Sequence, residues 1–155
     1  ENRILVPSPK LSTYDLQPEM SAYEIKNKLL VELQTTQPDF IVINFANTDM
    51  VGHTGVFEAA VKATQSVDSC LKEIVPLALE KNYHILIIAD HGNSDYMLNP
   101  DGSPNTAHSM NLVPIIYVSN SPREIKAGKL GDVAPTILKV MNIDKPAEME
   151  GNELI

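Results

Sequence analysis

Three short runs of β-branched and aliphatic residues constrain the fold of this chain more than any other feature. They span residues 40–45, 84–89 and 113–118, and each is almost entirely apolar. Strands that are covered on both faces of a sheet have this character, whereas strands with one solvated face alternate apolar and polar residues. The three runs therefore predict strands of a parallel or mixed sheet.

Amphipathic helical patterns lie between these runs. The first covers about 22–35 and begins with Ser21 and Glu24 at the spacing of a capping box, in which two side chains satisfy free N–H groups of the first turn. The second covers about 57–81, and Pro76 within it is expected to kink or split the helix because proline lacks an N–H and clashes with the preceding turn. Both patterns predict helices that bury one apolar face.

Two further signals complete the secondary structure. Asp132 is placed to cap a third helix that has Pro135 in its first turn, where a missing N–H costs little. The Asn-Pro-Asp-Gly sequence at 99–102 predicts a tight turn that closes a small hairpin. Helices that alternate with apolar strands predict an α/β sandwich, with helices on both faces of the sheet, in a single domain.

The charge of the chain excludes some classes of partner. Its 12 basic and 20 acidic residues give a net charge of −8, whereas a nucleic-acid-binding protein needs a basic surface. No apolar run approaches the ~18 residues of a membrane span, and the first residues lack a signal-peptide pattern. We therefore expect a cytoplasmic protein with neither nucleic acid nor membrane as its partner. Such an acidic chain binds phosphorylated acids only where bound cations supply positive charge.

Acidic and histidine side chains lie beside the ends of the predicted strands. Asp49 and His53 follow the first strand at a spacing of four, Asp90 and His91 follow the second directly, and His108 precedes the third. Ligands of open α/β sheets cluster at the carboxyl ends of strands. Carboxylate and imidazole ligands suit manganese, zinc or magnesium better than copper(I) or iron–sulfur clusters. The sequence therefore predicts a site for a pair of divalent metal ions.

Each of these groups also has an ordinary structural explanation when it is taken alone. Asp49 could cap a helix and His53 could be a solvated surface residue, while His108 alone is a weak candidate for a ligand. Their joint placement is the stronger signal, because unrelated structural histidines have no reason to converge on one edge of a sheet.

The segments that carry these groups resemble a known family. Asn44 to Gly55, Ala89-Asp90-His91-Gly92-Asn93 and Thr106-Ala107-His108 resemble, in order and spacing, consecutive motifs of the cofactor-independent phosphoglycerate mutases, which are members of the alkaline phosphatase superfamily. Residues 7–10, 13–15, 18–24 and 131–136 resemble the same family. The resemblance therefore extends over nearly the whole chain.

The resemblance implies a set of metal ligands. Asp49, His53 and His108 would bind one divalent ion, and Asp90 and His91 would bind a second one. Manganese is the usual metal in the family, and cobalt, zinc or magnesium also accept these ligands.

The resemblance also implies a fold and an activity. The chain, residues 1–155, would be the C-terminal portion of the phosphatase domain, a three-layer α/β/α sandwich with a mostly parallel sheet. The complete enzyme would interconvert 2-phosphoglycerate and 3-phosphoglycerate in glycolysis through a phosphoserine intermediate. The nucleophilic serine and the inserted transferase domain are expected in an N-terminal part of the same protein. No catalytic residue is therefore expected in this chain, which alone would be inactive.

Two other functions stay open on sequence grounds. The chain could belong to another phosphotransferase of the superfamily, such as a phosphopentomutase, although the segment from Asp49 to Gly55 is not shared by the superfamily at large. It could also be an isolated metal-binding domain that performs no catalysis.

Overall fold

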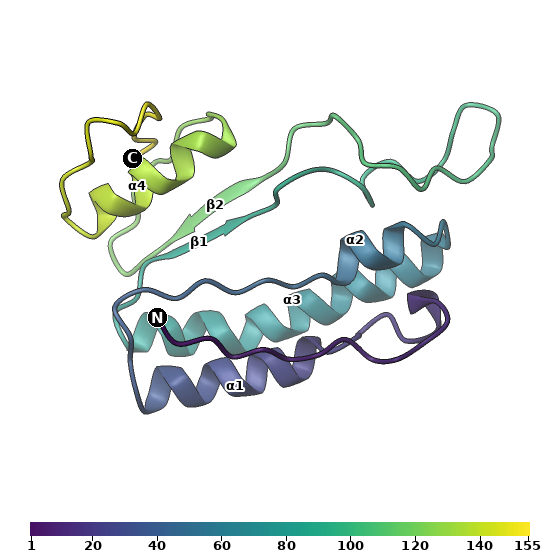
Figure 1. Cartoon of the computed structure of the whole chain (residues 1–155), viewed down its shortest axis with the longest axis horizontal. Coiled ribbons are helices and arrows are strands. Elements are labelled where there is room, and N and C mark those ends of the chain that lie inside the picture. The colour runs from purple at the N-terminus through teal and green to yellow at the C-terminus, as the bar shows by residue number, and fades with distance from the viewer. The chain divides into compact units, whose positions relative to one another are not determined.

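The computed structural model describes residues 1–155, and contacts within it divide the chain into two compact units (Figure 1). Unit 1 comprises residues 1–81 and 91–112, and unit 2 comprises residues 82–90 and 113–155. The chain thus passes from unit 1 to unit 2 and back before it ends in unit 2. No linker-like composition marks these crossings in the sequence.

Unit 1 is built from helices that pack on one another. Its elements are the 3-10 helix η1 (Tyr14–Leu16) and the α-helices α1 (Ala22–Gln34), α2 (Asn47–Gly52) and α3 (Phe57–Glu80). Helix α3 contacts both α1 and α2. The core between them consists of small and medium side chains: Met20, Val51, Ala59, Ala60, Ala63 and Met97. Alanines on α3 let the short helix α2 approach closely, which matters because α2 carries part of the candidate site.

Helix α1 confirms the first predicted helix, but its predicted capping box is wrong. Ser21 makes no side-chain cap, because its hydroxyl donates to the carbonyl of Pro7 at 2.7 Å instead. Leu29 and Leu33 are buried on the inner face. Lys26 is buried beside them and its ammonium group reaches Glu73 of α3 at 2.8 Å. The helix is therefore held by its apolar face and one ion pair rather than by its first turn.

Helix α3 continues through Pro76 as one element of 24 residues, so of the two predicted effects of proline the split does not occur, and the kink stays a prediction. Proline removes the donor for the carbonyl of Lys72, four residues earlier. Both residues are exposed, and water can satisfy that carbonyl.

None of the helices has the length and hydropathy that crossing a bilayer requires.

The sheet lies in unit 2 and differs from the predicted one. Strands β1 (Ile85–Ile88) and β2 (Ile115–Val118) form an antiparallel pair in which Ile85 lies opposite Val118. Two of the three predicted strands are confirmed, whereas residues 40–45 form no strand. The expected parallel pairing is absent from this sheet. A parallel pair needs a crossover connection that is usually helical, and no helix lies between β1 and β2, so the chain returns in the antiparallel direction.

The predicted hairpin and the last helix are both confirmed. The turn at 99–102 closes on an antiparallel bridge between Leu98 and Pro104, and Gly102 has the positive φ of 82° that the turn requires. Helix α4 (Val133–Val140) follows the 3-10 helix η2 (Leu130–Asp132) and contains Pro135 in its first turn.

Asp132 does not cap α4 with its side chain, contrary to the prediction. Its carboxylate accepts hydrogen bonds from the backbone N–H groups of Lys129 at 2.9 Å and Asn152 at 2.8 Å. These two bonds hold the pKa of Asp132 below its ordinary value. The carboxylate thus ties the C-terminal segment to the start of α4.

Replacement of Leu33 tests the packing of unit 1. Leu33 is 2% exposed, so Leu33→Ala should lower the free energy of unfolding by about 2–5 kcal/mol, because it leaves a cavity under α1. Val31→Ala is the matched control on the same helix, since Val31 is 55% exposed and its loss should change stability by less than about 0.5 kcal/mol. Urea unfolding measures both, and equal losses would contradict the assigned inner face.

Replacement of Asp132 tests the two backbone hydrogen bonds of its carboxylate in unit 2, through the pH dependence of the free energy of unfolding. A carboxyl group with a lowered pKa in the folded state adds stability above its unfolded pKa, and that stability is lost as the pH falls through the folded pKa. Asp132→Asn should therefore destabilise the protein at pH 7 and narrow the stability difference between pH 7 and pH 3. Urea unfolding at both pH values measures this, with the exposed Asp144→Asn as control. An unchanged pH dependence would show that the two backbone bonds contribute nothing.

Candidate metal centre

The short helix α2 presents the first two candidate ligands. Asp49 lies within α2 and His53 is the residue that ends it, so a spacing of four places both side chains on one side of the helix. The Nε2 atom of His53 lies 3.2 Å from Oδ1 of Asp49. The helical turn therefore brings the side chains of Asp49 and His53 together, as their spacing predicts.

A buried asparagine fixes the start of α2. Asn47 is 2% exposed, and its amide donates to the carbonyls of Pro18 at 2.9 Å and Glu19 at 2.8 Å. These bonds join α2 to the segment that leads into α1. Asn47 carried no signal in the sequence, because an asparagine near a helix start is common in any protein.

His108 completes a cluster of three ligand atoms. Its Nε2 lies 3.1 Å from Oδ1 of Asp49 and 3.1 Å from Nε2 of His53. The other ring nitrogen of His53, Nδ1, lies 2.6 Å from the carbonyl oxygen of Thr106. Because a carbonyl can only accept, Nδ1 carries the hydrogen and Nε2 of neutral His53 keeps its lone pair. The hydrogen bond to the Thr106 carbonyl thus orients the His53 ring so that the lone pair on its Nε2 faces Asp49 and His108.

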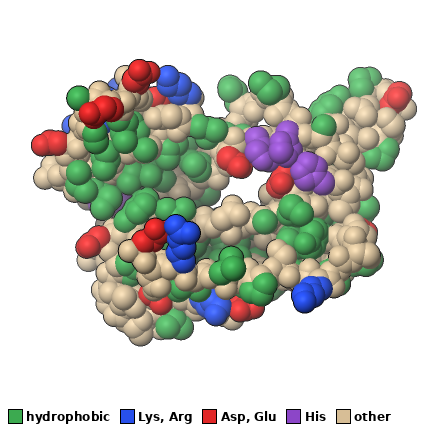
Figure 2. Space-filling view, viewed as in Figure 1, with side chains coloured by type: hydrophobic (Ala, Val, Ile, Leu, Met, Phe, Trp, Pro, Cys, Tyr) green, Lys and Arg blue, Asp and Glu red, His purple; other side chains and the backbone are tan.

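His91 lies against the same cluster but farther from Asp49. Its ring stacks on the ring of His108, with centroids 3.6 Å apart and planes inclined by 20°. Its Nε2 is 4.0 Å from Oδ1 of Asp49. Asp49, His91 and His108 each offer an atom within 4.8 Å of the others, which is close enough for one metal ion. The histidines of unit 1 form one patch on the surface (Figure 2).

Asn93 is a further polar residue of the site, and nothing in the sequence marked it as functional. It is 6% exposed, and its Nδ2 donates to Oδ1 of Asp49 at 3.2 Å and lies 3.4 Å from Nδ1 of His53. Gly52 makes room for it, because a Cβ atom there would lie 1.9 Å from Oδ1 of Asn93. A buried amide thus holds one orientation of the Asp49 carboxylate.

The remaining residues singled out from the sequence lie in unit 2. Asp90 precedes His91 in the chain but belongs to unit 2, so its part in the site depends on the sequence argument alone. His84, the fourth histidine, does not join the cluster of unit 1. Its Nδ1 lies 2.5 Å from the hydroxyl of Tyr117, across the β1–β2 pair.

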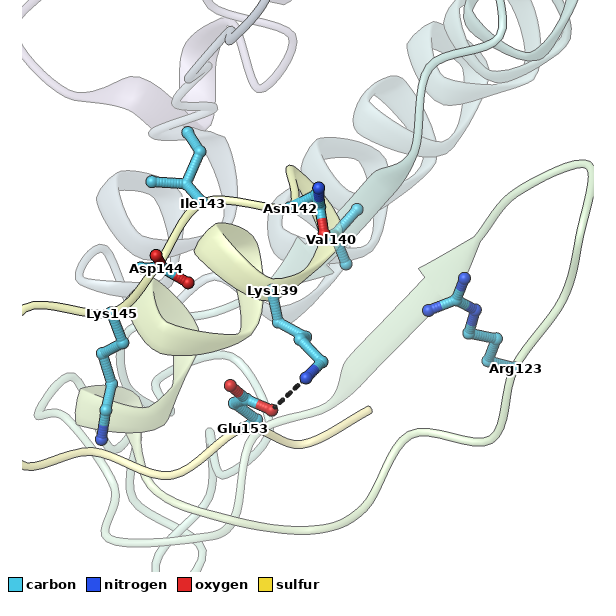
Figure 3. Close-up of a pocket in the computed structure, with 8 residues that line it drawn as sticks. All are labelled: Arg123, Lys139, Val140, Asn142, Ile143, Asp144, Lys145 and Glu153. Carbon is cyan, nitrogen blue, oxygen red and sulfur yellow. Dashed lines mark ion pairs between the residues drawn. The ribbon is translucent and has the colours of Figure 1, made fainter.

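Unit 2 also contains a cavity of about 330 Å³ at the end of α4 (Figure 3). Its lining includes Arg123, Lys139 and Lys145, but two of these cations are already engaged. Lys139 pairs with Glu153 at 3.2 Å, and Lys145 donates to the carbonyl of Gly151 at 2.9 Å. These contacts explain the lysines as ties to the C-terminal segment, so the cavity is a poor candidate for an anion site.

Relatives of known name match the chain over its whole length. It is 57% identical to the 2,3-bisphosphoglycerate-independent phosphoglycerate mutase of Bacteroides thetaiotaomicron, 56% identical to that of Flavobacterium psychrophilum and 55% identical to that of Clostridium botulinum. Each match covers 100% of this chain and 31% of the relative, so the chain spans about a third of the length of these proteins.

A solved structure and a family model agree with these relatives. A crystal structure of Leishmania mexicana phosphoglycerate mutase at low cobalt concentration matches with a TM-score of 0.85 and 27% identity, over 95% of this chain and 30% of that one. This match confirms the alkaline-phosphatase-like α/β fold that the resemblance implies. A model described as the Metalloenzyme superfamily matches residues 1–145. The resemblance seen in the motifs is thereby confirmed, and the chain belongs to the Metalloenzyme superfamily.

Proposed function

We propose that Asp49, His53 and His108 bind one divalent metal ion. The observation that carries this proposal is the convergence of three electron-rich atoms, Oδ1 of Asp49 and Nε2 of both histidines, at 3.1–3.2 Å from one another. Ligands that surround a tetrahedral ion at bond lengths of 2.0–2.1 Å are separated by about 3.4 Å. A hydrogen on Nε2 of His108 would be divided between Oδ1 of Asp49 and Nε2 of His53 in a three-centre bond, whereas a cation binds a lone pair of each atom directly.

We assign His91 with Asp90 to a second ion beside the first. Two observations support this assignment: Nε2 of His91 is 4.0 Å from Oδ1 of Asp49, farther than the ligand atoms of His53 and His108, and the ring of His91 stacks on that of His108. The spacing of Asp49, His91 and His108 also permits a single ion held by these three residues. The number of metal ions bound per chain separates the two arrangements. Manganese is the metal we expect, and cobalt, zinc and magnesium suit the same ligands.

The complete protein is, in this proposal, a phosphoglycerate mutase that interconverts 2-phosphoglycerate and 3-phosphoglycerate in cytoplasmic glycolysis. The names of relatives that are 55–57% identical over the whole chain support it, together with the motif that contains Asp49 and His53. This chain would supply the C-terminal part of the phosphatase domain. The serine nucleophile and the transferase domain would come from the part of the relatives that this chain does not match.

The residues of this chain would orient and hold charge rather than break bonds. Divalent ions bound here would neutralise phosphoryl oxygens and lower the pKa of an attacking serine. The carbonyl of Thr106 keeps the hydrogen of His53 on Nδ1, so that Nε2 stays available as a ligand. The amide of Asn93 holds the Asp49 carboxylate at the same point. These contacts pre-form the site, which is what charge stabilisation during phosphoryl transfer requires.

Substrate preference tests the proposed activity. The complete protein should isomerise 3-phosphoglycerate in preference to ribose 5-phosphate and nitrophenyl phosphate, and chelation of metal should abolish the reaction. A preference for ribose 5-phosphate would instead favour a phosphopentomutase of the same superfamily. The 155-residue chain alone should bind Mn²⁺ without isomerising 3-phosphoglycerate, and turnover by the chain alone would contradict the assignment of the nucleophile to another part of the protein.

Removal of a ligand tests the metal site itself. His108→Ala in the complete protein should lower mutase activity by about 100-fold or more, since even partners of metal ligands contribute about 10–100-fold. The melting temperature without metal should change little, because His108 is an exposed loop residue. His84→Ala is the matched control, as it removes a histidine that pairs with Tyr117 instead, and activity should be retained. A large fall in the metal-free melting temperature of His108→Ala would indicate a structural role.

A further inference from the structure

The two histidine loops of the site are joined by one backbone bridge next to the histidines, and they meet again farther on, where the Asn105 N–H donates to the Met97 carbonyl at 2.9 Å. Gly92 pairs with Ser109 in an isolated antiparallel bridge, with the Ser109 N–H donating to the Gly92 carbonyl at 2.8 Å. His91 precedes Gly92 and His108 precedes Ser109. Next to the two rings there is thus one backbone hydrogen bond, which constrains them weakly because contacts of this kind near exposed loops open readily.

Asp95 adds a second, side-chain connection between the same loops. Its carboxylate accepts from the Ser109 hydroxyl at 3.0 Å and 2.8 Å, and from the amide of Asn111 at 2.6 Å. Asp95 follows His91 in one loop, while Ser109 and Asn111 follow His108 in the other. The Asn111 and Ser109 bonds lower the pKa of Asp95, so the carboxylate is ionised at neutral pH. Asp95, Ser109 and Asn111 are called the loop clasp below.

Gly92 shows that the loop clasp fills the space on one side of the bridge. A Cβ atom at Gly92 would lie 2.1 Å from the Ser109 hydroxyl oxygen and 2.6 Å from Oδ1 of Asp95. Successive side chains of an extended segment point to opposite faces. His91 and His108, each one residue away from the bridged pair, therefore point to the face opposite the clasp, where their rings stack at 3.6 Å.

We propose that Asp95 is a positioning residue for the metal site, because the loop clasp joins the two loops that carry His91 and His108 and so sets the separation of their rings. This inference rests on the proposed metal function of those histidines. Asp95 and Asn111 are exposed and Ser109 is half-buried, so the contribution of the clasp to the stability of the fold is small. Its effect is on geometry, since a metal site needs ligands held close to their bound positions before the ion arrives.

The test compares Asp95→Ala with a matched variant of the same loop region. Asp101 also accepts from a serine, with Ser103 Oγ at 2.6 Å and Ser103 N at 2.9 Å, but it connects no histidine loop. Titration of the metal-free chain with Mn²⁺ should show about tenfold weaker binding for Asp95→Ala and no change for Asp101→Ala. Asp95→Glu restores a carboxylate within reach of Ser109 and Asn111 and should recover most of the affinity.

A measurement without metal separates failure of the clasp from failure of the metal site. Proton NMR of the metal-free chain should show nuclear Overhauser contacts between the rings of His91 and His108, and these should be lost in Asp95→Ala but kept in Asp101→Ala. Persistent ring contacts with unchanged Mn²⁺ affinity in Asp95→Ala would overturn the positioning role. If the unaltered chain binds no Mn²⁺ but Asp95→Ala still loses the ring contacts, the clasp stands and the metal function fails.

Discussion

The site depends on the close approach of three electron-rich atoms. Oδ1 of Asp49 and the Nε2 atoms of His53 and His108 lie within 3.1–3.2 Å of each other. The Nδ1–H of His53 donates to the Thr106 carbonyl, which leaves the lone pair of His53 Nε2 facing the other two atoms. Such atoms repel unless a proton or a cation lies between them. The surrounding fold must therefore hold them together at some cost. A chain with a net charge of −8 gains from this arrangement, because bound cations supply the positive charge that a phosphorylated acid requires.

The three atoms are held by contacts of other residues, and none of these supporting residues is a candidate ligand. Asn47 fastens the start of α2 through two backbone carbonyls. Gly52 leaves room for Asn93, whose amide meets the Asp49 carboxylate. Asp95 joins the loops that carry the other histidines. Asparagine and glycine can do this work because a neutral amide bonds to a carboxylate without competing for the cation, and a missing Cβ costs no space.

The sequence singled out the candidate ligands but not the residues that support them. Asp49 and His53 lie four positions apart, so helical geometry brings them to one side of α2. The signal came from the placement of these two residues together with the other candidate ligands beside strand ends, because each group alone has an ordinary structural explanation. Asn47, Asn93 and Asp95 carried no such signal, since their partners are remote backbone groups or side chains of other loops. The sequence also could not assign Asp90 to a metal ion. Its neighbour His91 belongs to the other compact unit, so adjacency along the chain does not decide which ion the Asp90 carboxylate approaches.

The differences between the predicted and observed fold follow from how local each element is. Helices α1, α3 and α4 form close to their predicted positions because their hydrogen bonds lie within one segment, and even Pro76 does not interrupt α3. A strand needs a partner, and apolar character alone cannot supply one. Residues 40–45 have the composition of a buried strand, yet Phe40 and Val42 are 52% and 76% exposed and no ladder forms. The metal cluster does not depend on strand pairing, because α2 and the two histidine loops all lie within unit 1. Helix packing and loop hydrogen bonds set their positions there.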